Sequence, residues 1–589
     1  MNAFRGRTMD SLQRPDAIAS GFEDVGLQPG VGAHAPTNAA RSARPVGMLS
    51  TSTLGLTLAA CGGGGGSDSG GIVTIVAPPT ATPTPIPTFT PTAITDAQAT
   101  RFLGQATMGA NSAGIAELKA RGFAGWIANE FAKPRATTHW DWLVANGFRD
   151  AANMNGTQGF DNVMWSQMIG AGDQLRQRIG MALLQILVVG ADGMNLKWRQ
   201  FAMAAYVDVL MDNAFGNFRT LLGGIVTNAA MASFLTFLNN RKANPVTGAI
   251  PDENFAREVM QLFTIGLHRL NMDGTRVLSN GHPVETYTAA DVSALARVFT
   301  GLTLDSTDNS TPDRLRRPLV VDAGLHETGP STFLGATVPA GVNATEAIRI
   351  ALDTIFLHPN VPPFVSKQLI QRLVTSNPSP AYVNRVAMKF ADNGTGIRGD
   401  MQAVIRAILL DEEARAEPSG VIAGKLREPV LRVTGWARAF GATSLSGKWD
   451  VGDTSDVSKR LGQAMGRASS VFNFFRPGYV PPGSAFATAE LVVPEMQITN
   501  ELSVIGYVNY MHWVVNNSTD LRTSYAELTG IADTGALIDR VNLLVAAGQV
   551  GHATLNKIRV AADSAKDPLI RIHTAILLLM ASPEYITQR

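Results

Sequence analysis

The stretch that decides the fold is Pro251-Asp-Glu-Asn-Phe-Ala-Arg-Glu-Val-Met-Gln-Leu-Phe-Thr-Ile-Gly266. It predicts one amphipathic helix, capped by Asp252 after a proline that disfavours helix before it. Gly266 is suited to end that helix. The apolar residues that share one side at helical spacing are Phe255, Val259, Leu262 and Phe263. We therefore expect this side to lie in the core.

The other side of the predicted helix carries Asn254, Arg257, Glu258 and Gln261, at i, i+3, i+4 and i+7. Side chains at these spacings can form hydrogen bonds, here from Asn254 to Glu258 and from Arg257 to Gln261. One interpretation is the solvated face of an ordinary amphipathic helix. The other is a buried polar network, in which Arg257 pairs with a buried Glu258 and fixes the placement of neighbouring helices.

This helix and other motifs resemble a large bacterial family, domain-of-unknown-function family 1800. The further motifs, in order, are Arg101-Phe-Leu-Gly-Gln-Ala-Thr107, Leu175-Arg-Gln-Arg-Ile179, Asn213-Ala-Phe-Gly-Asn-Phe-Arg219, Tyr287-Thr-Ala-Ala-Asp-Val292, Ala296-Arg-Val-Phe-Thr-Gly301, Leu325-His-Glu-Thr-Gly329, Phe333-Leu-Gly335, Ser470-Val-Phe-Asn-Phe-Phe-Arg-Pro-Gly-Tyr-Val-Pro-Pro482 and Ser582-Pro-Glu-Tyr585. The similarity runs from about Ala97 to the end. It implies an architecture and a location, but no established reaction.

Composition excludes some classes of function. The chain has 589 residues, enough to bury a sizeable core, with 45% hydrophobic and 16% charged residues. Its formal charge of +1 gives no field that would attract nucleic acid, so we expect no such partner. No apolar run reaches the roughly 20 residues of a membrane-spanning helix.

The beginning of the chain predicts export. Arg41 and Arg44 precede a weakly apolar stretch that leads into Leu58-Ala-Ala-Cys61, which resembles a bacterial lipobox. Cleavage before Cys61 and acylation of its thiol would attach the protein to a membrane. Cys61 is the single cysteine, so it has no disulfide partner within the chain. The alternative is an incidental small hydrophobe in a tail. The apolar stretch starts unusually late, which indicates a later translation start or a long n-region.

Two low-complexity segments follow Cys61. Gly62–Gly71 is a flexible Gly/Ser linker, and Ala77–Ala93 is a Pro/Thr tract with polyproline II character. At about 3.1 Å per residue the tract spans about 50 Å. We predict a leader over 1–60, an anchored linker over 61–94, an N-terminal helical lobe over 95–418 and a C-terminal helical lobe over 419–589.

The folded part is predicted to be mainly α-helical, as one large domain or two lobes, with one or two minor β-hairpins. Thr95 or Asp96 is suited to cap one helix and Thr288 or Thr286 another, and residues 165–189 are predicted to form one long helix. Asp273-Gly274 predicts a two-residue hairpin. Arg372 is expected on a solvated helix face.

His326-Glu327 is a second candidate, since a histidine beside a carboxylate suits acid/base work or metal binding. Adjacent residues rarely point at the same atom, so a structural role for His326 in fixing the turn is the alternative. Ser331 stands where relatives often have lysine, and Leu302 where many have tryptophan. The departure at Ser331 weakens any transfer of a charged site to this loop.

Several familiar motifs are missing from the sequence: a phosphate-binding Gly-rich loop, Gly-x-Ser-x-Gly and His-Glu-x-x-His. A single cysteine excludes thiolate metal clusters. We therefore expect no metal and no cofactor.

Two functions remain. The first is a lipid-anchored cell-envelope binding or assembly module, with the membrane and an unknown envelope protein as partners. The second is a hydrolase-like envelope enzyme whose polar cleft joins Arg257 and Glu258 to His326 and Glu327, with Glu258 as general base or ligand and Arg257 as anion clamp. An enzyme needs Glu258 and His326 close together in an open pocket.

Overall fold

The computed structural model describes residues 93–417 and 423–589. The predicted leader, Cys61 and nearly all of the predicted linker lie outside these residues. The described residues belong to one compact unit. Elements from both sides of residue 418 pack together within it, so the division into two lobes stays a prediction.

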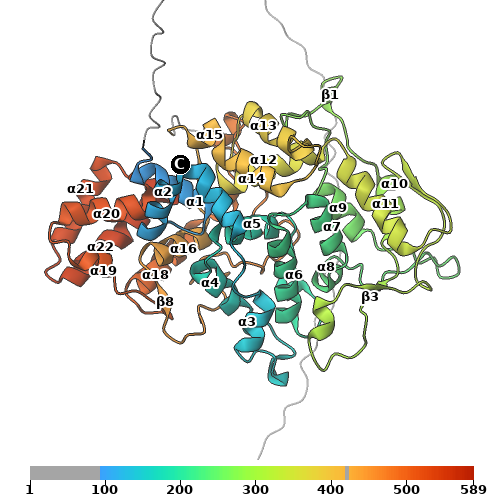
Figure 1. Cartoon of the computed structure of the whole chain (residues 1–589), viewed down its shortest axis with the longest axis horizontal. Coiled ribbons are helices and arrows are strands. Elements are labelled where there is room, and N and C mark those ends of the chain that lie inside the picture. Colours follow the sequence, from blue (N-terminus) through green and yellow to red (C-terminus); the bar gives the residue numbers. More distant parts are fainter. Residues whose placement is uncertain (1–92, 418–422) are drawn as a thin grey trace, which may run out of the picture. The chain divides into compact units, whose positions relative to one another are not determined.

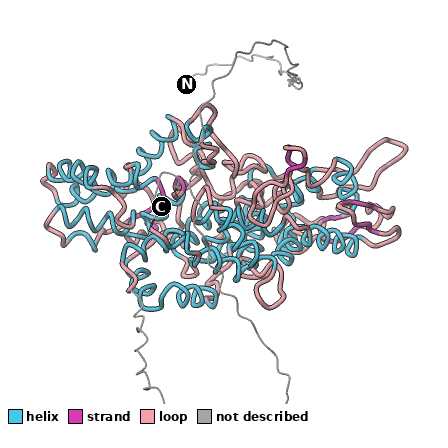
Figure 2. Tube along the Cα trace, turned by 90° about the horizontal axis from the view of Figure 1, so that it is seen from above, coloured by secondary structure: helices cyan, strands magenta, loops and turns pink. Residues whose placement is uncertain are grey.

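Helices dominate the described residues, as the sequence predicted (Figures 1 and 2). Those of the first half are α1 (Asp96–Ala106), α2 (Ser112–Ala132), α3 (His139–Ala145), α4 (Phe160–Gly170), α5 (Gln174–Leu184), α6 (Arg199–Asn213), α7 (Phe218–Val226), α8 (Ala229–Phe234), α9 (Asn254–Gln261) and α10 (Ala289–Val298). Those that follow are α11 (Ala344–Leu357), α12 (Val361–Leu373), α13 (Pro380–Ala391), α14 (Met401–Leu410), α15 (Glu412–Arg415), α16 (Pro429–Ala439), α17 (Ala485–Thr488), α18 (Glu501–Val515), α19 (Ala526–Thr529), α20 (Thr534–Ala546), α21 (His552–Asp563), α22 (Pro568–Met580) and α23 (Pro583–Ile586). Single 3-10 turns are η1 (Ala151–Asn153), η2 (Ala191–Gly193), η3 (Asp313–Arg316) and η4 (Pro494–Ile498).

The strands are short and pair in twos, all antiparallel. The pairs are β1 (Leu278–Ser279) with β2 (His282–Pro283), β3 (Leu302–Thr303) with β4 (Val320–Val321), β5 (Ser331–Phe333) with β6 (Ala336–Val338), β7 (Lys425–Leu426) with β10 (Thr587–Gln588), and β8 (Thr443–Ser444) with β9 (Leu521–Arg522). The minor β content is confirmed. Two of these pairs, β7 with β10 and β8 with β9, join distant parts of the chain.

The buried α5 and α6 lie in the middle of Figure 1, against α2, α3, α4 and α7. Nearly every residue of α5 is buried, which fits its apolar run. Near the C-terminus, α20, α21 and α22 pack on one another, and α20 also packs on α1. Among the helices described, none combines the length and the apolar character needed to span a bilayer.

Local signals set several boundaries correctly. The side chains of Thr95 and Thr288 cap α1 and α10. The chain does form a hairpin at Asp273-Gly274, where the Asn271 amide donates to the Thr275 carbonyl at 2.8 Å and the Gly274 amide to the Asn271 carbonyl at 2.9 Å, but its loop has three residues and not the predicted two. The long helix predicted over 165–189 is wrong, because the chain breaks between α4 and α5 at Ala171–Asp173. Glycines on either side of Ala171 favour that break.

Candidate functional site

The stretch from Pro251 to Gly266 contains α9, which is a shorter helix than predicted. Glu253, not Asp252, takes the N-cap position, and it makes no side-chain capping bond. The Asp252 carboxylate instead accepts from the Asn254 amide at 2.9 Å. After Gln261 the chain turns tightly, and Gly266 at φ 71° donates its amide to Met260 at 3.0 Å. The helix therefore ends at Gln261, before Gly266, so the prediction that Gly266 ends it is wrong, although Gly266 does take the left-handed conformation after the turn.

The apolar side of α9 lies in the core as expected, with Phe255, Val259 and Phe263 fully buried. Phe255 packs between Phe237 and Phe299, at 4.3 and 4.8 Å between ring centroids. This aromatic contact fixes how α9 is rotated about its axis. The rotation in turn decides which polar residues face inward.

The polar side of α9 is not one buried network. Glu258 is 6% exposed, whereas the Arg257 side chain is 44% exposed. Arg257 pairs with Glu253 at 3.1 Å, not with Gln261 or Glu258. Asn254 donates to Thr236 at 3.4 Å, and Gln261 accepts from the Tyr287 hydroxyl at 2.9 Å. The predicted hydrogen bonds from Asn254 to Glu258 and from Arg257 to Gln261 are wrong. Asn254 and Gln261 bond to neighbouring segments instead, and Arg257 bonds to Glu253 at the start of its own helix.

Glu258 stands out among these residues. Its Oε2 is buried and has no hydrogen-bond partner among the residues that the structure describes. Burial raises the pKa of this carboxyl above its usual value, and the charge of nearby Arg257 opposes the shift only in part. A carboxyl in such surroundings can hold and release a proton nearer neutral pH.

His326 lies at the opposite end of α10 from Tyr287. It is 3% exposed, and its Nδ1 lies 3.1 Å from the carbonyl oxygen of Thr300, to which it can donate. Its Nε2 is buried without a partner in the described part of the chain. The hydrogen bond from His326 to Thr300 holds the loop that carries His326 against the end of α10.

Glu327 makes separate contacts. Its Oε1 accepts from the Gly329 amide at 2.9 Å and lies 3.6 Å from the Arg297 guanidinium. These contacts lower the pKa of Glu327, the Gly329 amide most of all. His326 and Glu327 therefore hold their own loop in shape.

The two predicted groups are not bonded to one another. Gln261, one turn beyond Glu258, bonds Tyr287 just before α10, and His326 bonds Thr300 just after it. Across residues 93–417 and 423–589, no hydrogen bond or ion pair joins Glu258 to His326, and no group of three His, Cys, Asp or Glu side chains is arranged for a metal.

The structure shows a second polar centre that sequence reasoning missed. We call it the buried ionic cluster; its members are Arg178 on α5, Arg372 on α12, Lys425 on β7, Glu428 before α16 and Glu495 in η4. All five are at most 3% exposed. Lys425 Nζ lies 2.9 Å from Glu495 Oε1 and 3.6 Å from Glu428 Oε1.

Amides and backbone carbonyls complete this cluster. Lys425 Nζ and Arg178 both donate to the Arg372 carbonyl, at 2.9 and 2.7 Å. Arg372 donates to the Gln185 carbonyl at 3.0 Å. Glu428 Oε2 accepts from the side-chain amides of Gln185 and Gln463. One centre thus joins segments that lie more than 300 residues apart.

Charges in the cluster are strongly desolvated. Burial lowers the pKa of Arg372 to about 10 and that of Arg178 below its usual value. Burial raises the pKa of Glu495, and Lys425 only partly offsets this effect. Removing one member of such a set leaves an unpaired buried charge, which is far more costly than a lost surface pair.

Arg372 was predicted to be solvated, and that prediction is wrong. Its helix, α12, is buried on nearly all sides, which the sequence alone did not reveal. One local signal was available: Lys425 and Glu428 stand three residues apart, just before Pro429 opens α16. Nothing local connects them to Glu495.

A third buried group surrounds Asp208 on α6. Its Oδ1 accepts from the His139 amide at 2.9 Å and lies 3.0 Å from His139 Nδ1, while Arg135 also pairs with it. Oδ2 accepts from the Trp140 amide at 3.0 Å. Burial would raise the pKa of Asp208, but His139 and Arg135 outweigh it and lower the pKa to about 2. This carboxylate thus holds the first turn of α3.

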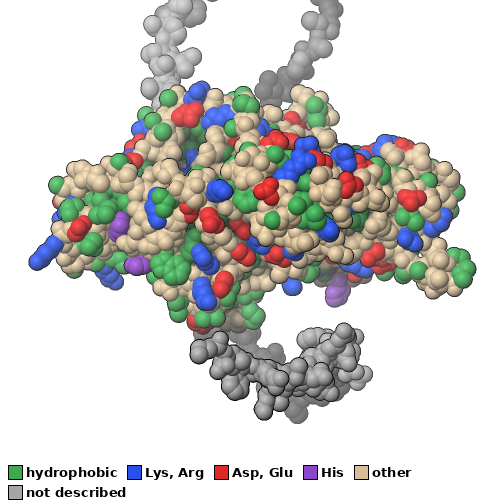
Figure 3. Space-filling view, turned by 90° about the horizontal axis from the view of Figure 1, so that it is seen from below, with side chains coloured by type: hydrophobic (Ala, Val, Ile, Leu, Met, Phe, Trp, Pro, Cys, Tyr) green, Lys and Arg blue, Asp and Glu red, His purple; other side chains and the backbone are tan. Residues whose placement is uncertain are grey.

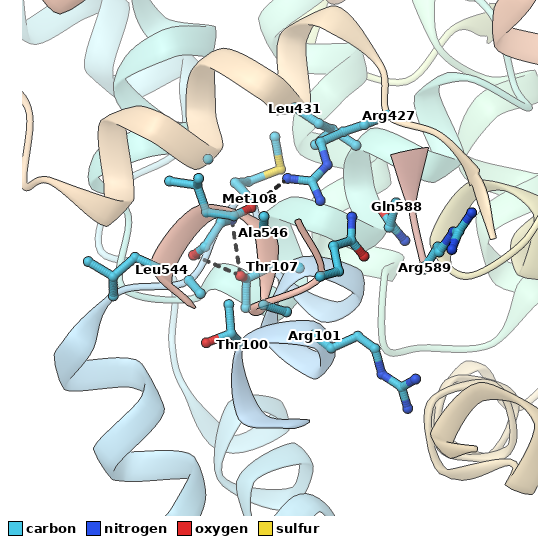
Figure 4. A pocket seen from close by; sticks show the side chains of 17 residues that line it. Thr100, Arg101, Thr107, Met108, Arg427, Leu431, Leu544, Ala546, Gln588 and Arg589 are labelled. Atoms are coloured by element: carbon cyan, nitrogen blue, oxygen red, sulfur yellow. Dashed lines mark hydrogen bonds between the residues drawn. The ribbon is translucent and has the colours of Figure 1, made fainter. Parts of the chain in front are cut away.

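One small cavity of about 40 Å³ lies between α1, α16 and the end of α20 (Figure 4). Thr107, Arg427 and Gln588 are among its lining residues. Its Thr107 hydroxyl donates to Gly109, and Arg427 donates to Val545, so these donors are already used. The space suits a few water molecules and not an organic substrate. Neither Glu258 nor His326 lines it.

No curated protein and no solved structure matches this chain. A family model described as protein of unknown function (DUF1800) matches residues 101–587, which is most of the chain. The match spans α1 to β10 and includes α9 and the buried ionic cluster. The chain therefore belongs to the DUF1800 family.

Proposed function

We propose that this protein is a lipid-anchored module of the bacterial cell envelope whose helical body binds or assembles with another envelope protein. The observation that carries this proposal is Leu58-Ala-Ala-Cys61, which contains the single cysteine of the chain. A thiol at that position suits acylation after cleavage. The following linker gives the body room to reach a partner away from the membrane.

The described residues support a binding body over a hydrolase-like enzyme. No hydrogen bond or ion pair joins Glu258 to His326 among the described residues, and His326 Nδ1 donates to the Thr300 carbonyl just after α10. Arg257, proposed as an anion clamp, pairs with Glu253 on the surface. The polar cleft of the enzyme hypothesis would need these groups to meet. For that reason we propose the binding module.

The anchor is tested by Cys61→Ser in the natural host, with membrane and soluble fractions compared. We expect most of the wild-type protein in the membrane fraction and Cys61→Ser in the soluble fraction. Ser67→Ala, in the linker, is the matched control and should stay with the membrane. Labelling with a fatty-acid probe should mark the wild type and the control only. If the Cys61→Ser protein still sediments with membranes, whether or not the fatty-acid probe labels it, the proposed lipid anchor at Cys61 is wrong.

The partner is tested by chemical crosslinking of the native protein followed by affinity purification and mass spectrometry. We expect crosslinks from the helical body to an envelope protein. Crosslinks to the linker alone would contradict a binding role for the body.

A further inference from the structure

The surface of α18 is unusual among the described helices. Its exposed large hydrophobic side chains, with their exposed fractions, are Leu502 56%, Val504 50%, Ile505 56%, Val508 36% and Trp513 41%. Green apolar side chains are visible on the face of the molecule seen from below (Figure 3), and Figure 1 places α18 on that lower side. Contiguous apolar surface of this kind marks an interaction site.

The opposite face of α18 is held firmly in place. Tyr507 donates to the Met580 carbonyl at 3.0 Å, and Tyr510 is fully buried with Arg460 over its ring at 5.7 Å. Gly506 lies so close to the loop at Val457 that a Cβ there would meet the Val457 oxygen at 2.7 Å. The exposed apolar face is therefore a fixed surface of the body and not a frayed end.

The exposed face has a self-complementary order. At 100° per residue, its centre line is Glu501, Ile505, Val508 and His512, at i, i+4, i+7 and i+11. An acid stands at one end, a histidine at the other and two aliphatic residues between them. Read in the opposite direction, the line pairs each residue with a complementary one: Glu501 with His512 and Ile505 with Val508. Leu502 and Trp513 lie on the same flank of α18. The antiparallel alignment therefore places Leu502 of one copy against Trp513 of the other.

We propose that a second copy of this chain covers this face, with the two α18 helices packed antiparallel about a two-fold axis between Ile505 and Val508. Each His512 ring then donates to the Glu501 carboxylate of the other copy, at both ends of the contact. The aliphatic and tryptophan side chains are removed from water between them. An isologous interface of this kind closes as a dimer.

Charge favours a second copy over a lipid surface. Helices that lie on anionic membranes carry Lys and Arg on or beside the apolar face. The exposed positions of α18 include Glu501, Asn509 and His512, but no Lys or Arg. The nearby loop carries Lys459 and Arg460, together with Asp456. This arrangement offers little net attraction to a lipid headgroup.

The dimer is tested on the full chain in a Cys61→Ser background, which makes the result independent of the proposed anchor. Sedimentation velocity over a range of concentrations should show a reversible dimer. Ile505→Glu should weaken dimerisation at least tenfold, because it places charge in the apolar centre. Val560→Glu on α21, where the side chain is 74% exposed, is the matched control and should leave the dimer unchanged.

Charge exchange tests the antiparallel register. Glu501→Lys should weaken the dimer several-fold, and His512→Glu should weaken it further by opposing two carboxylates. The double variant Glu501→Lys/His512→Glu should recover the dimer, because each lysine then meets a glutamate of the other copy. Only an antiparallel pair of like helices predicts this recovery.

Three results would overturn the proposal. The first is a monomer at all concentrations. The second is a dimer that Ile505→Glu leaves intact. The third is binding of the Cys61→Ser protein to vesicles of three parts phosphatidylethanolamine to one part phosphatidylglycerol, if Ile505→Glu abolishes that binding. This result would show that the exposed face of α18 binds lipid.

Discussion

Lys425 Nζ lies 2.9 Å from Glu495 Oε1 at a point where neither side chain reaches solvent. Lys425 enters from β7, at the start of the C-terminal part, and Glu495 from η4, 70 residues later. Lys425 Nζ also donates to the backbone carbonyl of Arg372 on α12, which accepts a second hydrogen bond from Arg178 on α5. The ion pair is thus the point at which four distant segments share one set of charges.

Lys425→Met should destabilise the protein by about 3–5 kcal/mol, because it removes the cation that pairs directly with the buried carboxylates of Glu495 and Glu428. Urea unfolding followed by circular dichroism measures the change. Lys119→Met is the matched control, since Lys119 pairs with Asp96 at 2.6 Å while both side chains are over 40% exposed. Loss of that surface pair should lower the free energy of unfolding by less than about 1 kcal/mol. Equal losses in the two variants would contradict the argument.

If Lys425→Met fails to fold, Lys425→Met/Glu495→Gln keeps the prediction testable. Replacing both charges removes one of the unpaired groups, so the double variant should be more stable than Lys425→Met. A double variant that is less stable than the single one would show that the two residues do not act as a pair.

The helical fold was predictable because its signals are local. Thr95 and Thr288 cap α1 and α10 with their own side chains, and Asp273-Gly274 forms a hairpin, although with a three-residue loop. Each of these features depends on residues within one turn. The break between α4 and α5 was missed because an apolar run continues across it, and periodicity alone does not show where such a run bends.

The buried polar groups were less predictable, because burial depends on rotation and on distant partners. Packing of Phe255 against Phe237 and Phe299 turns Glu258 inward and leaves Arg257 outside. The sequence pattern does not show which of the two is buried, because both lie on the polar side of the predicted helix. The buried ionic cluster needs Arg178, Arg372 and Glu495 to meet, and no local pattern contains that information.

Stability at low pH should depend on Asp208. Its pKa in the folded protein is about 2, below the ordinary value of 3.8. Its contribution is therefore present above pH 3.8 and is lost as the pH falls through 2. At neutral pH that contribution is about 2 kcal/mol. Unfolding free energies measured from pH 2 to pH 6 should fall less steeply toward acid for Asp208→Asn than for the wild type. Parallel curves would contradict the assigned role.

Glu258 should show the opposite dependence. Its pKa in the folded protein is raised above the ordinary 4.5, so its stabilising contribution is present below pH 4.5 and is lost as the pH rises through the folded value. Glu258→Gln removes this titration. The stability of the wild type relative to Glu258→Gln should therefore decrease as the pH is raised from 4 to 8. A relative stability that increases with pH would show that Glu258 gains a cation in the folded state.

The protein should remain stable when Arg257 on α9 is replaced by alanine, but not when Phe255 on the same helix is replaced. Arg257 pairs with Glu253 at the surface, so Arg257→Ala should change the free energy of unfolding by about 0–1 kcal/mol. Phe255→Ala empties a fully buried site between two aromatic rings and should cost about 3–5 kcal/mol. Denaturant unfolding of both variants distinguishes the two positions. A loss of several kcal/mol in Arg257→Ala would mean that its guanidinium supports buried Glu258 after all, and the network first expected from the sequence would be correct.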